Sequence, residues 1–459
     1  MKYHHSINPL RLPALGISLL FLVSCFSRCN RGVKIDAAAE ETASSIDTGL
    51  LRFISEIRAV DHHAHPNSIQ TNDKDADALP LDALGDIVIP VRVRPESPIW
   101  MEAWKGLYEF SSDSLNETTK KEFEQKADSI MKVKGEGFPT WVLDRCHIEV
   151  MIANRLSMGA GLDNPRFRWV FYGDALLYPL SVKNEGETSD QKLLFPLVEQ
   201  HRKEFLAERN LLRLPSTLGS YLRELVTPVL EDKKRGGSLA VKFEAAYLRS
   251  LQFGSADSTS AAKIYSRYAN GGEPSRTDYR LLQDFLFTYI AKEAGRLGMA
   301  IHIHSYPGVG NHFAASGSDP ILLEHVFNDP QLSQTKFVLV HGGGPFTDHT
   351  LAMISKPNVY MDISLLTQLW TPFQLSVALR NYLSQYPEKV LFGTDAVSFG
   401  PGMGWGLSAW IANESGRRAL AMALTAMMRD QEISRQRAEE LSVMVMRNNA
   451  DALYHLGLQ

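Results

Sequence analysis

Four strand-like runs of this chain each end in a side chain that can bind a metal ion. The first leads into DHHAHP at residues 61–66, and the others close at His304 in IHIHS, His341 in FVLVHGGG and Asp395 in VLFGTDA. Side chains two positions apart in a strand leave the same face, so His63 and His65 can point into one cavity. An HxH pair alone is weak evidence, because the chain has 14 histidines and two surface histidines before a proline turn would look the same. Four such endings in one chain favour a common metal site.

These runs belong to a longer pattern in which strand-like and helical segments alternate. Eight parallel strands with intervening helices predict an α/β fold, the (β/α)8 TIM barrel, whose chemistry gathers at the C-terminal ends of the strands. The length of 459 residues and the 44% hydrophobic composition are sufficient for the core of one large barrel. The predicted strands are residues 57–63, 148–153, 168–173, 238–243, 300–304, 337–341, 358–363 and 390–394.

Two long stretches exceed a minimal barrel, residues 66–147 after the first strand and residues 174–236 after the third. Both leave from strand C-terminal ends, so both are predicted as insertions with helical segments that build the substrate pocket. The linker between the second and third strands is short and rich in Gly, Asn and Pro, which argues against a full helix there. Apolar residues at helical spacing predict outer helices over 278–299, 408–428 and 434–456.

Charge and cysteine content exclude several classes of protein. The net charge of -4 and the absence of a basic stripe interleaved with aromatic residues argue against a nucleic-acid partner. Cys146 is the only cysteine in the predicted barrel, and Cys29 lies far upstream. No disulfide framework and no cysteine-rich zinc site can therefore form within the barrel.

The first 25 residues have the features of a secretory signal. Lys2 and Arg11 precede an apolar run, residues 12–23, that is too short to span a bilayer. The run ends in LVSC, which resembles a bacterial lipobox, so Cys25 is predicted to be lipidated and to become the new N-terminus. The alternative is an ordinary signal peptide with an incidental cysteine.

The predicted organisation follows from this reading. Residues 1–25 form the lipoprotein signal peptide, residues 26–48 a polar flexible tether, and residues 49–459 the barrel. Phe26 follows the cysteine instead of Asp, so nothing obvious retains the protein at an inner membrane. We therefore expect a lipid-anchored protein of the bacterial cell envelope, at the outer membrane or facing the periplasm. Formation of a homo-oligomer is left open.

The predicted site combines several histidines with one carboxylate. His302 faces the same way as His304 but lies deeper in its strand, so we prefer His304 as the ligand, with His302 supporting it or packed in the core. Three glycines follow His341, but no GK[ST] does, which argues against a phosphate loop. A lone Asp395 could equally be a turn or a helix cap. Nitrogen and oxygen ligands of this kind suit Zn²⁺, with Mn²⁺ or Fe²⁺ as alternatives.

Seven ordered motifs resemble the amidohydrolase superfamily. They lie within about residues 55–456 and are DHHAHP, LDRCHIEVMIANR, VKFEAAY, IHIHSYPGVGN, FVLVHGGGPF, NVYMDIS and VLFGTDA. The chain is most similar to the amidohydrolase-related branch, which includes a hydrolase-like domain fused to some glutamine synthetases. The resemblance implies that His63, His65, His304 and Asp395 bind the metal. It also implies that His341 polarises the substrate or shuttles a proton, and that Asp395 accepts a proton from the attacking water.

Lys242 ends the predicted fourth strand, where binuclear members of the superfamily carry a carboxylated lysine that bridges two metals. The alternative is an interior lysine paired with Glu244 or Asp395, since a buried lysine must lose its charge or find a partner. The family often has an arginine directly after the tyrosine of this motif, whereas this chain has Leu248 and then Arg249. A substrate-binding arginine is therefore in doubt.

The sequence thus predicts a metal-dependent hydrolase that cleaves an amide or ester bond of a small molecule with a metal-activated water. A non-oxidative decarboxylase is the first alternative, because HGGG followed by Pro345-Phe346 also resembles that group. A non-catalytic binding lipoprotein is a second alternative, and it would be expected to lack at least one ligand. Uronate isomerisation is a weaker alternative from the same superfamily.

Overall fold

The computed structural model describes residues 46–70, 73–85, 87–114, 116–255, 257–307, 310–400 and 402–458. The predicted signal peptide and nearly all of the predicted tether lie outside these residues. The described part of the chain begins at Ile46, whereas the predicted start of the barrel domain is residue 49. Asp47 caps the first described helix, α2 (Thr48–Glu56), by accepting a hydrogen bond from the Leu50 N–H at 2.7 Å, and it also pairs with Arg435.

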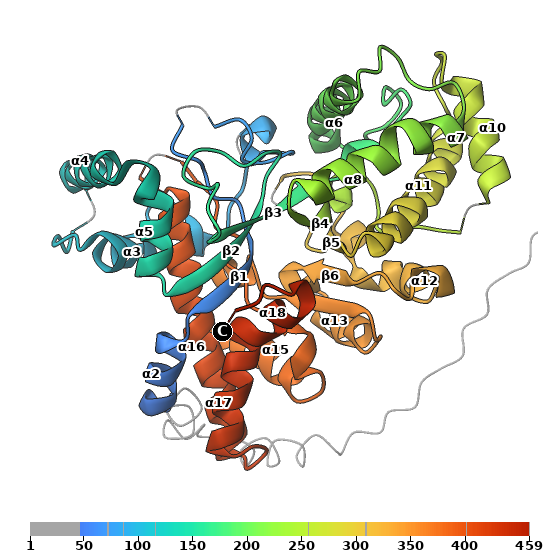
Figure 1. Cartoon of the computed structure of the whole chain (residues 1–459). Helices are drawn as coiled ribbons and strands as arrows, with labels where there is room; N and C mark the ends of the chain where they lie inside the picture. The colour runs from blue at the N-terminus through green and yellow to red at the C-terminus, as the bar shows by residue number, and fades with distance from the viewer. Residues whose placement is uncertain are drawn as a thin grey trace, which may run out of the picture. The chain divides into compact units, whose positions relative to one another are not determined.

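Eight parallel strands pair in sequence order, which confirms the predicted (β/α)8 barrel (Figure 1). Every strand is buried along most of its length, because helices cover the outside of a parallel barrel. The strands are β1 (Ala59–Ala64), β2 (Ile148–Asn154), β3 (Phe167–Tyr172), β4 (Ser238–Phe243), β5 (Ala300–His304), β6 (Phe337–Val340), β7 (Val359–Asp362) and β8 (Val390–Leu391).

The barrel closes between its first and last strands. The His62 N–H donates to the Phe392 carbonyl at 2.9 Å, and the Asp395 N–H donates to the His63 carbonyl at 2.7 Å. Asp61 reinforces the closure, because its carboxylate accepts hydrogen bonds from the backbone N–H and the hydroxyl of Thr394 at 2.8 and 2.6 Å. The end of the chain is thereby fastened to β1 at the level of the candidate ligands.

Small and branched apolar side chains fill the inside of the barrel. They come from most of the strands and include Val60, Val150, Ile152, Val170, Ala240, Val338 and Leu391. The C-terminal helix α18 (Asn449–Tyr454) adds Ala450 to the same cluster. The barrel interior is therefore a packed core, and the chemistry is confined to its rim.

The three predicted outer helices are present. They are α11 (Arg276–Arg296), α16 (Trp405–Arg429) and the final run from α17 (Arg435–Val443) through a π-helical turn at Met444–Asn448 into α18. Ser275 caps α11 by accepting from the Asp278 N–H at 3.2 Å. The remaining outer helices are α9 (Ala245–Leu248), α10 (Ser258–Tyr268), α12 (Glu324–Phe327), α13 (Thr347–Ile354), α14 (Leu366–Leu369) and α15 (Pro372–Leu383). Of these described helices, none is both long and apolar enough to cross a bilayer.

Both predicted insertions are helical, and they lie on opposite sides of the barrel in Figure 1. The first contains α3 (Pro98–Tyr108), α4 (Glu117–Lys134) and α5 (Phe138–Arg145), held by an aromatic cluster in which Trp104 stacks on Phe123 with ring centroids 4.1 Å apart. The second contains α6 (Ser189–Glu208), α7 (Leu218–Tyr221), a π-helical turn (Leu222–Val226) and α8 (Thr227–Arg235). Residues 155–166 between β2 and β3 form no helix, as predicted.

A buried arginine on α16 ties the outer layer to the start of the barrel. The Arg417 guanidinium donates to the carbonyls of Ile54, Ile57 and His147, the last two at 3.0 and 3.2 Å. We expect Arg417→Met to lower the free energy of unfolding by about 3 kcal/mol or more, because each buried acceptor left unpaired costs about 1–3 kcal/mol. Urea denaturation measures this loss. Arg418→Met is the matched control, since Arg418 is exposed on the same helix and should change the midpoint little.

Candidate metal centre

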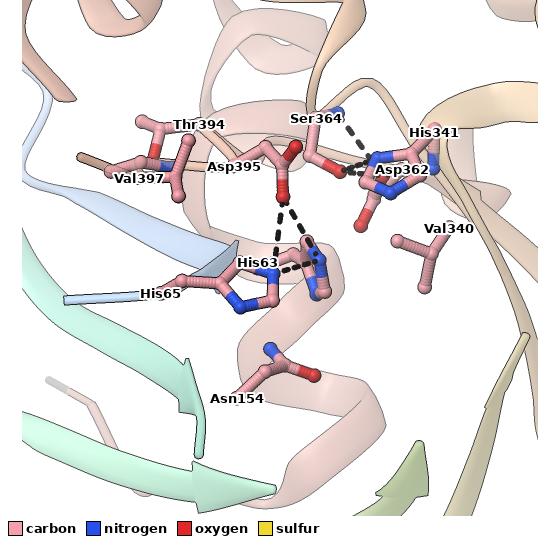
Figure 2. A network of polar contacts seen from close by, with 12 residues as sticks. His63, His65, Asn154, Val340, His341, Asp362, Ser364, Thr394, Asp395 and Val397 are labelled. Carbon is pink, nitrogen blue, oxygen red and sulfur yellow. Dashed lines mark hydrogen bonds and ion pairs between the residues drawn. The ribbon is translucent and has the colours of Figure 1, made fainter. Parts of the chain in front are cut away.

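Three of the predicted ligands meet at the C-terminal mouth of the barrel. His63 and His65 leave the same face of β1, and Asp395 follows β8. The Nε2 atoms of the two histidines lie 3.3 Å apart, and they lie 3.1 Å (His63) and 3.4 Å (His65) from Asp395 Oδ1 (Figure 2). Strand alternation thus places the HxH pair as the sequence suggested, and barrel closure brings the carboxylate to it.

His341 joins this group, and His304 lies at its edge. Each of three buried residues offers one ligand atom, and these atoms all lie within 4.8 Å of one another; the residues are His63, His341 and Asp395. His304 lies beside His341, with ring centroids 4.7 Å apart. Its Nε2 donates to the Tyr306 carbonyl at 3.0 Å, which leaves Nδ1 as the atom available to a metal. The group of His63, His341 and Asp395 therefore contains His341, to which the sequence gave a catalytic role, and does not contain His304.

Protonation states in the cluster are those of metal ligands. Burial lowers the pKa of His63 and of His341 well below the ordinary value, and it lowers the pKa of His304 to about 3. Burial alone would raise the pKa of Asp395, but the nearby imidazoles of His341 and His65 hold it below its usual range. Neutral imidazoles and an ionised carboxylate are the forms that bind a divalent cation.

The donor set fits a divalent cation such as Zn²⁺. Asp395 Oδ1 is buried and makes no hydrogen bond of good geometry within the described structure, although two imidazole nitrogens lie within 3.4 Å of it. A cation between these atoms would satisfy the carboxylate oxygen and the nitrogen lone pairs together. His63, His65, His341 and Asp395 are the residues that would hold it, with His304 next to them.

Ser364 and Asp362 determine which nitrogen of His341 carries the proton. The Ser364 hydroxyl donates to Asp362 Oδ1 at 2.6 Å, so it must accept from His341 Nδ1 at 2.9 Å. The backbone N–H of His341 donates to the same oxygen, Asp362 Oδ1, at 2.9 Å. Nδ1 is therefore protonated, and the lone pair of Nε2 is free to face the cluster (Figure 2).

We expect Ser364→Ala to lower activity or metal affinity about 10- to 100-fold, because loss of a partner that orients a ligating histidine typically has this effect. Ser364→Thr keeps the hydroxyl and should restore most of the loss. Nitrogen-15 NMR of histidine-labelled protein identifies the tautomer directly, with His341→Gln used to assign the signal. If the alanine variant retains the Nδ1–H tautomer and full activity, Ser364 does not position His341.

His65 is held by two residues that no sequence motif indicated. The Tyr172 hydroxyl lies 3.0 Å from His65 Nδ1, and Asp77 Oδ2 lies 3.4 Å from the same atom. Nδ1 can donate to these oxygens, which directs Nε2 towards Asp395. Tyr172 ends β3, so its place at the rim could have been inferred, whereas Asp77 comes from the first insertion with no local signal.

His302 lies away from the metal cluster. Its Nε2 contacts the Tyr454 hydroxyl at 2.6 Å, and that hydroxyl also lies 2.7 Å from His62 Nε2. His62 Nδ1 in turn lies 2.7 Å from Asp362 Oδ2. A chain of buried polar contacts therefore runs from α18 through His62 to Asp362, the residue that holds Ser364.

Two of the candidate residues have backbone conformations that are unusual for their type. His341 has φ of 71° and Asp395 has φ of 56°, both in the left-handed region that residues other than glycine rarely adopt. The Gln368 side-chain amide donates to the carbonyls of Thr394 and Asp395 at 2.8 and 2.7 Å and so stabilises this turn. Such strain is common where a site requires one orientation of a side chain.

Lys242 is fully buried next to His63. Its Nζ lies 3.2 Å from His63 Nε2. No ion pair joins Lys242 to Glu244 or Asp395 in the described structure, but Lys242 lies close enough to act on the pKa of both carboxylates, so the paired interior lysine stays a prediction. A bridging role for a carboxylated Lys242 likewise stays a prediction.

A cavity of about 600 Å³ opens onto the cluster. Its inner wall includes His65, His341 and Asp395, and apolar side chains such as Ile87, Ile89, Val93, Leu369 and Phe399 line the rest. The first insertion supplies much of this lining, as predicted. The second insertion supplies none of the described lining. Instead it lines an adjoining cavity of about 890 Å³ around His201, which shares lining residues between 73 and 80 with the metal cavity, so the expectation that both insertions build the substrate pocket was half wrong. Arg249 is buried against Asp284 at 2.8 Å and does not line the metal cavity.

The fold and the site together define a (β/α)8 barrel with a His/His/Asp group at its C-terminal mouth, the class of metal-dependent hydrolase-like enzymes. Residues 267–456 match the family model described as Amidohydrolase. This match covers the C-terminal part of the barrel and agrees there with the resemblance to the amidohydrolase superfamily, a family that implies a divalent metal ion. The link to domains fused to glutamine synthetases remains a resemblance.

Solved structures share the fold at low sequence identity. Glucuronate isomerase from Caulobacter crescentus aligns with a TM-score of 0.60 and 14% identity over 93% of this chain and 96% of that chain. Uronate isomerase from Thermotoga maritima aligns with a TM-score of 0.56 and 14% identity over 90% and 99%. A protein from Lactobacillus casei ATCC 334, assigned as a metal-dependent hydrolase, aligns with a TM-score of 0.51 and 18% identity over 90% and 99%. No curated protein sequence matches the chain.

Proposed function

We propose that this protein is a metal-dependent hydrolase that cleaves an amide or ester bond of a small molecule. The observation that carries the proposal is the convergence of His63, His341 and Asp395 at the base of a cavity that is large enough for a small substrate. A divalent ion held there supplies Lewis acidity, which lowers the pKa of water towards about 7 and polarises a carbonyl oxygen. Zn²⁺ is the ion that this donor set suits best, with Mn²⁺ or Fe²⁺ as alternatives.

Asp395 and His341 perform the proton chemistry in this proposal. Asp395 accepts the proton from the attacking water and passes it to the leaving amine or alcohol, because it is the ionised group at the centre of the cluster. His341 presents an unprotonated Nε2, so it binds the ion or orients the substrate without adding charge. The strained turns at these two residues fix both side chains before substrate arrives.

Water labelled with ¹⁸O tests the reaction. The purified protein, with its metal content measured, is offered a panel of small amides, esters and carboxylic acids in H₂¹⁸O, with Asp395→Asn as the inactive control. Hydrolysis places one ¹⁸O atom in a new carboxylate and releases an amine or alcohol. Release of CO₂ would establish a decarboxylase, a product of unchanged mass an isomerase, and binding without turnover a non-catalytic lipoprotein.

We further propose that Cys25 carries a lipid that anchors the barrel in the cell envelope, since LVSC follows an apolar run of signal-peptide length. Cys25→Ala should then abolish labelling by a fatty-acid analogue and move the protein from the membrane to the soluble or unprocessed fraction. Cys29→Ala is the matched control. Unchanged membrane fractionation of the Cys25 variant would refute the anchor.

A further inference from the structure

The cavity beside the metal cluster is acidic. Asp73, Asp77, Glu244 and Asp395 line it, whereas Lys242 is the one lysine or arginine among its described lining residues. Lys242 is already in contact with His63 Nε2. Away from the metal ligands, the described lining residues therefore offer no arginine and no free lysine to a substrate that carries a carboxylate.

Apart from Asp395 in the metal cluster, Glu244 is the carboxylate of this wall that has an unused acceptor. Its side chain is 4% exposed, lines the cavity, and has an Oε2 atom with no hydrogen-bond partner in the described structure. Its backbone N–H is held by both oxygens of Asp174 at 2.9 and 3.0 Å, so its position after β4 is fixed. Buried acceptors without partners are rare in folded proteins and often indicate a missing ligand.

The other carboxylates of the wall already have partners. Asp73 forms an ion pair with Arg155 at 2.8 Å, and Asp395 belongs to the metal cluster. Asp77 accepts the Leu79 N–H at 3.1 Å and faces His65. A cation next to Glu244 Oε2 would give this buried oxygen the partner that it lacks.

We propose that Glu244 binds a protonated amine of the substrate, so that the enzyme acts on amides or esters that carry a cationic amine beside an apolar group. The apolar group packs against the wall formed by Ile87, Ile89, Val93 and Phe399. Asp77 lines the same cavity and adds negative charge near Glu244, but the proposal does not require it to contact the amine. This inference rests on the proposed function only for the nature of the bond that is cleaved.

Binding of two uncleavable probes tests the proposal independently of turnover. The probes are 4-phenylbutylamine and the uncharged 4-phenylbutanol, titrated into the full-length, zinc-loaded protein by calorimetry. A hydrogen bond to a charged group contributes about 1.5–3 kcal/mol, so the amine should bind about 10- to 100-fold more tightly than the alcohol. Glu244→Gln should abolish this preference while leaving alcohol binding unchanged. Glu204→Gln, a matched substitution in the adjoining cavity around His201, should retain the preference.

Equal binding of the two probes to the wild-type protein, absence of binding of both, or an amine preference that survives in Glu244→Gln would overturn the assignment. The remaining alternative is that Glu244 binds a second metal ion. Elemental analysis tests it, because the metal content would then fall from two ions per chain in the wild type to one in Glu244→Gln. Amine binding through Glu244 with no hydrolysis of any amide or ester would contradict only the proposed function.

Discussion

Replacing Asp395 with asparagine is expected to reduce kcat/KM by about 10⁴-fold, the upper end of what loss of a general base causes. The amide keeps the size of the side chain but removes the negative charge that faces His63 and His65 at 3.1 and 3.4 Å. It also removes the proton acceptor for the attacking water. Metal affinity should fall as well, because the carboxylate is the one anionic ligand of the His63, His341 and Asp395 group.

Steady-state kinetics and elemental analysis of the same preparations measure both effects of the Asp395 substitution. Asp348→Asn is the matched control, because Asp348 is exposed on α13 and should leave both quantities unchanged. Circular dichroism shows whether the barrel still folds, since the Asp395 N–H also participates in its closure. A folded Asp395→Asn variant with normal metal content and normal turnover would refute the metal-centre assignment.

Removal of His341 is expected to cost about 10² to 10⁴ in rate, whereas removal of Lys242 should cost much less if one metal ion suffices. His341 presents its Nε2 to the cluster and is held by Ser364. Lys242 contacts only the nitrogen of His63 among the donors of the cluster. Turnover and metal stoichiometry of His341→Ala and Lys242→Ala therefore compare a mononuclear with a binuclear site.

The two outcomes for Lys242 differ in kind. A mononuclear site predicts a metal content close to one ion per chain in the wild type and in both variants. It also predicts that Lys242→Ala retains activity. A carboxylated Lys242 that bridges two ions predicts instead that its loss halves the metal content and abolishes activity, with partial recovery on addition of short carboxylic acids. The buried position of Lys242 beside His63 is compatible with either state.

Much of the barrel could be predicted from the sequence because its signals are local. A buried parallel strand is a short continuous apolar run, and each of the eight runs became a strand within a few residues of its predicted limits. The ligand positions followed for the same reason, since a histidine or aspartate that ends such a run must lie at the rim. His63, His65 and Asp395 needed no knowledge of tertiary contacts beyond barrel closure.

The residues that support the ligands could not be predicted in this way. Asp77 reaches His65 from an insertion, and Gln368 reaches the Asp395 carbonyl from α14. Their roles depend on how distant segments pack, which leaves no trace in local periodicity. The different contributions of the two insertions have the same origin, because a stretch that leaves the correct end of a strand can still fold away from the metal cavity.

The closure of the barrel by the segment that carries Asp395 has a consequence for biosynthesis. His63 lies near the start of the domain and Asp395 near its end, and a hydrogen bond of 2.7 Å between their backbones fastens β1 to the segment after β8. While the chain emerges from the ribosome, the HxH pair is made long before its carboxylate partner, so the nascent protein holds only half of a metal site. The complete metal site can therefore form only after the last strand has been translated. Enzyme activity would then indicate that the barrel has closed. A chain terminated before residue 390 would have neither the fold nor the centre.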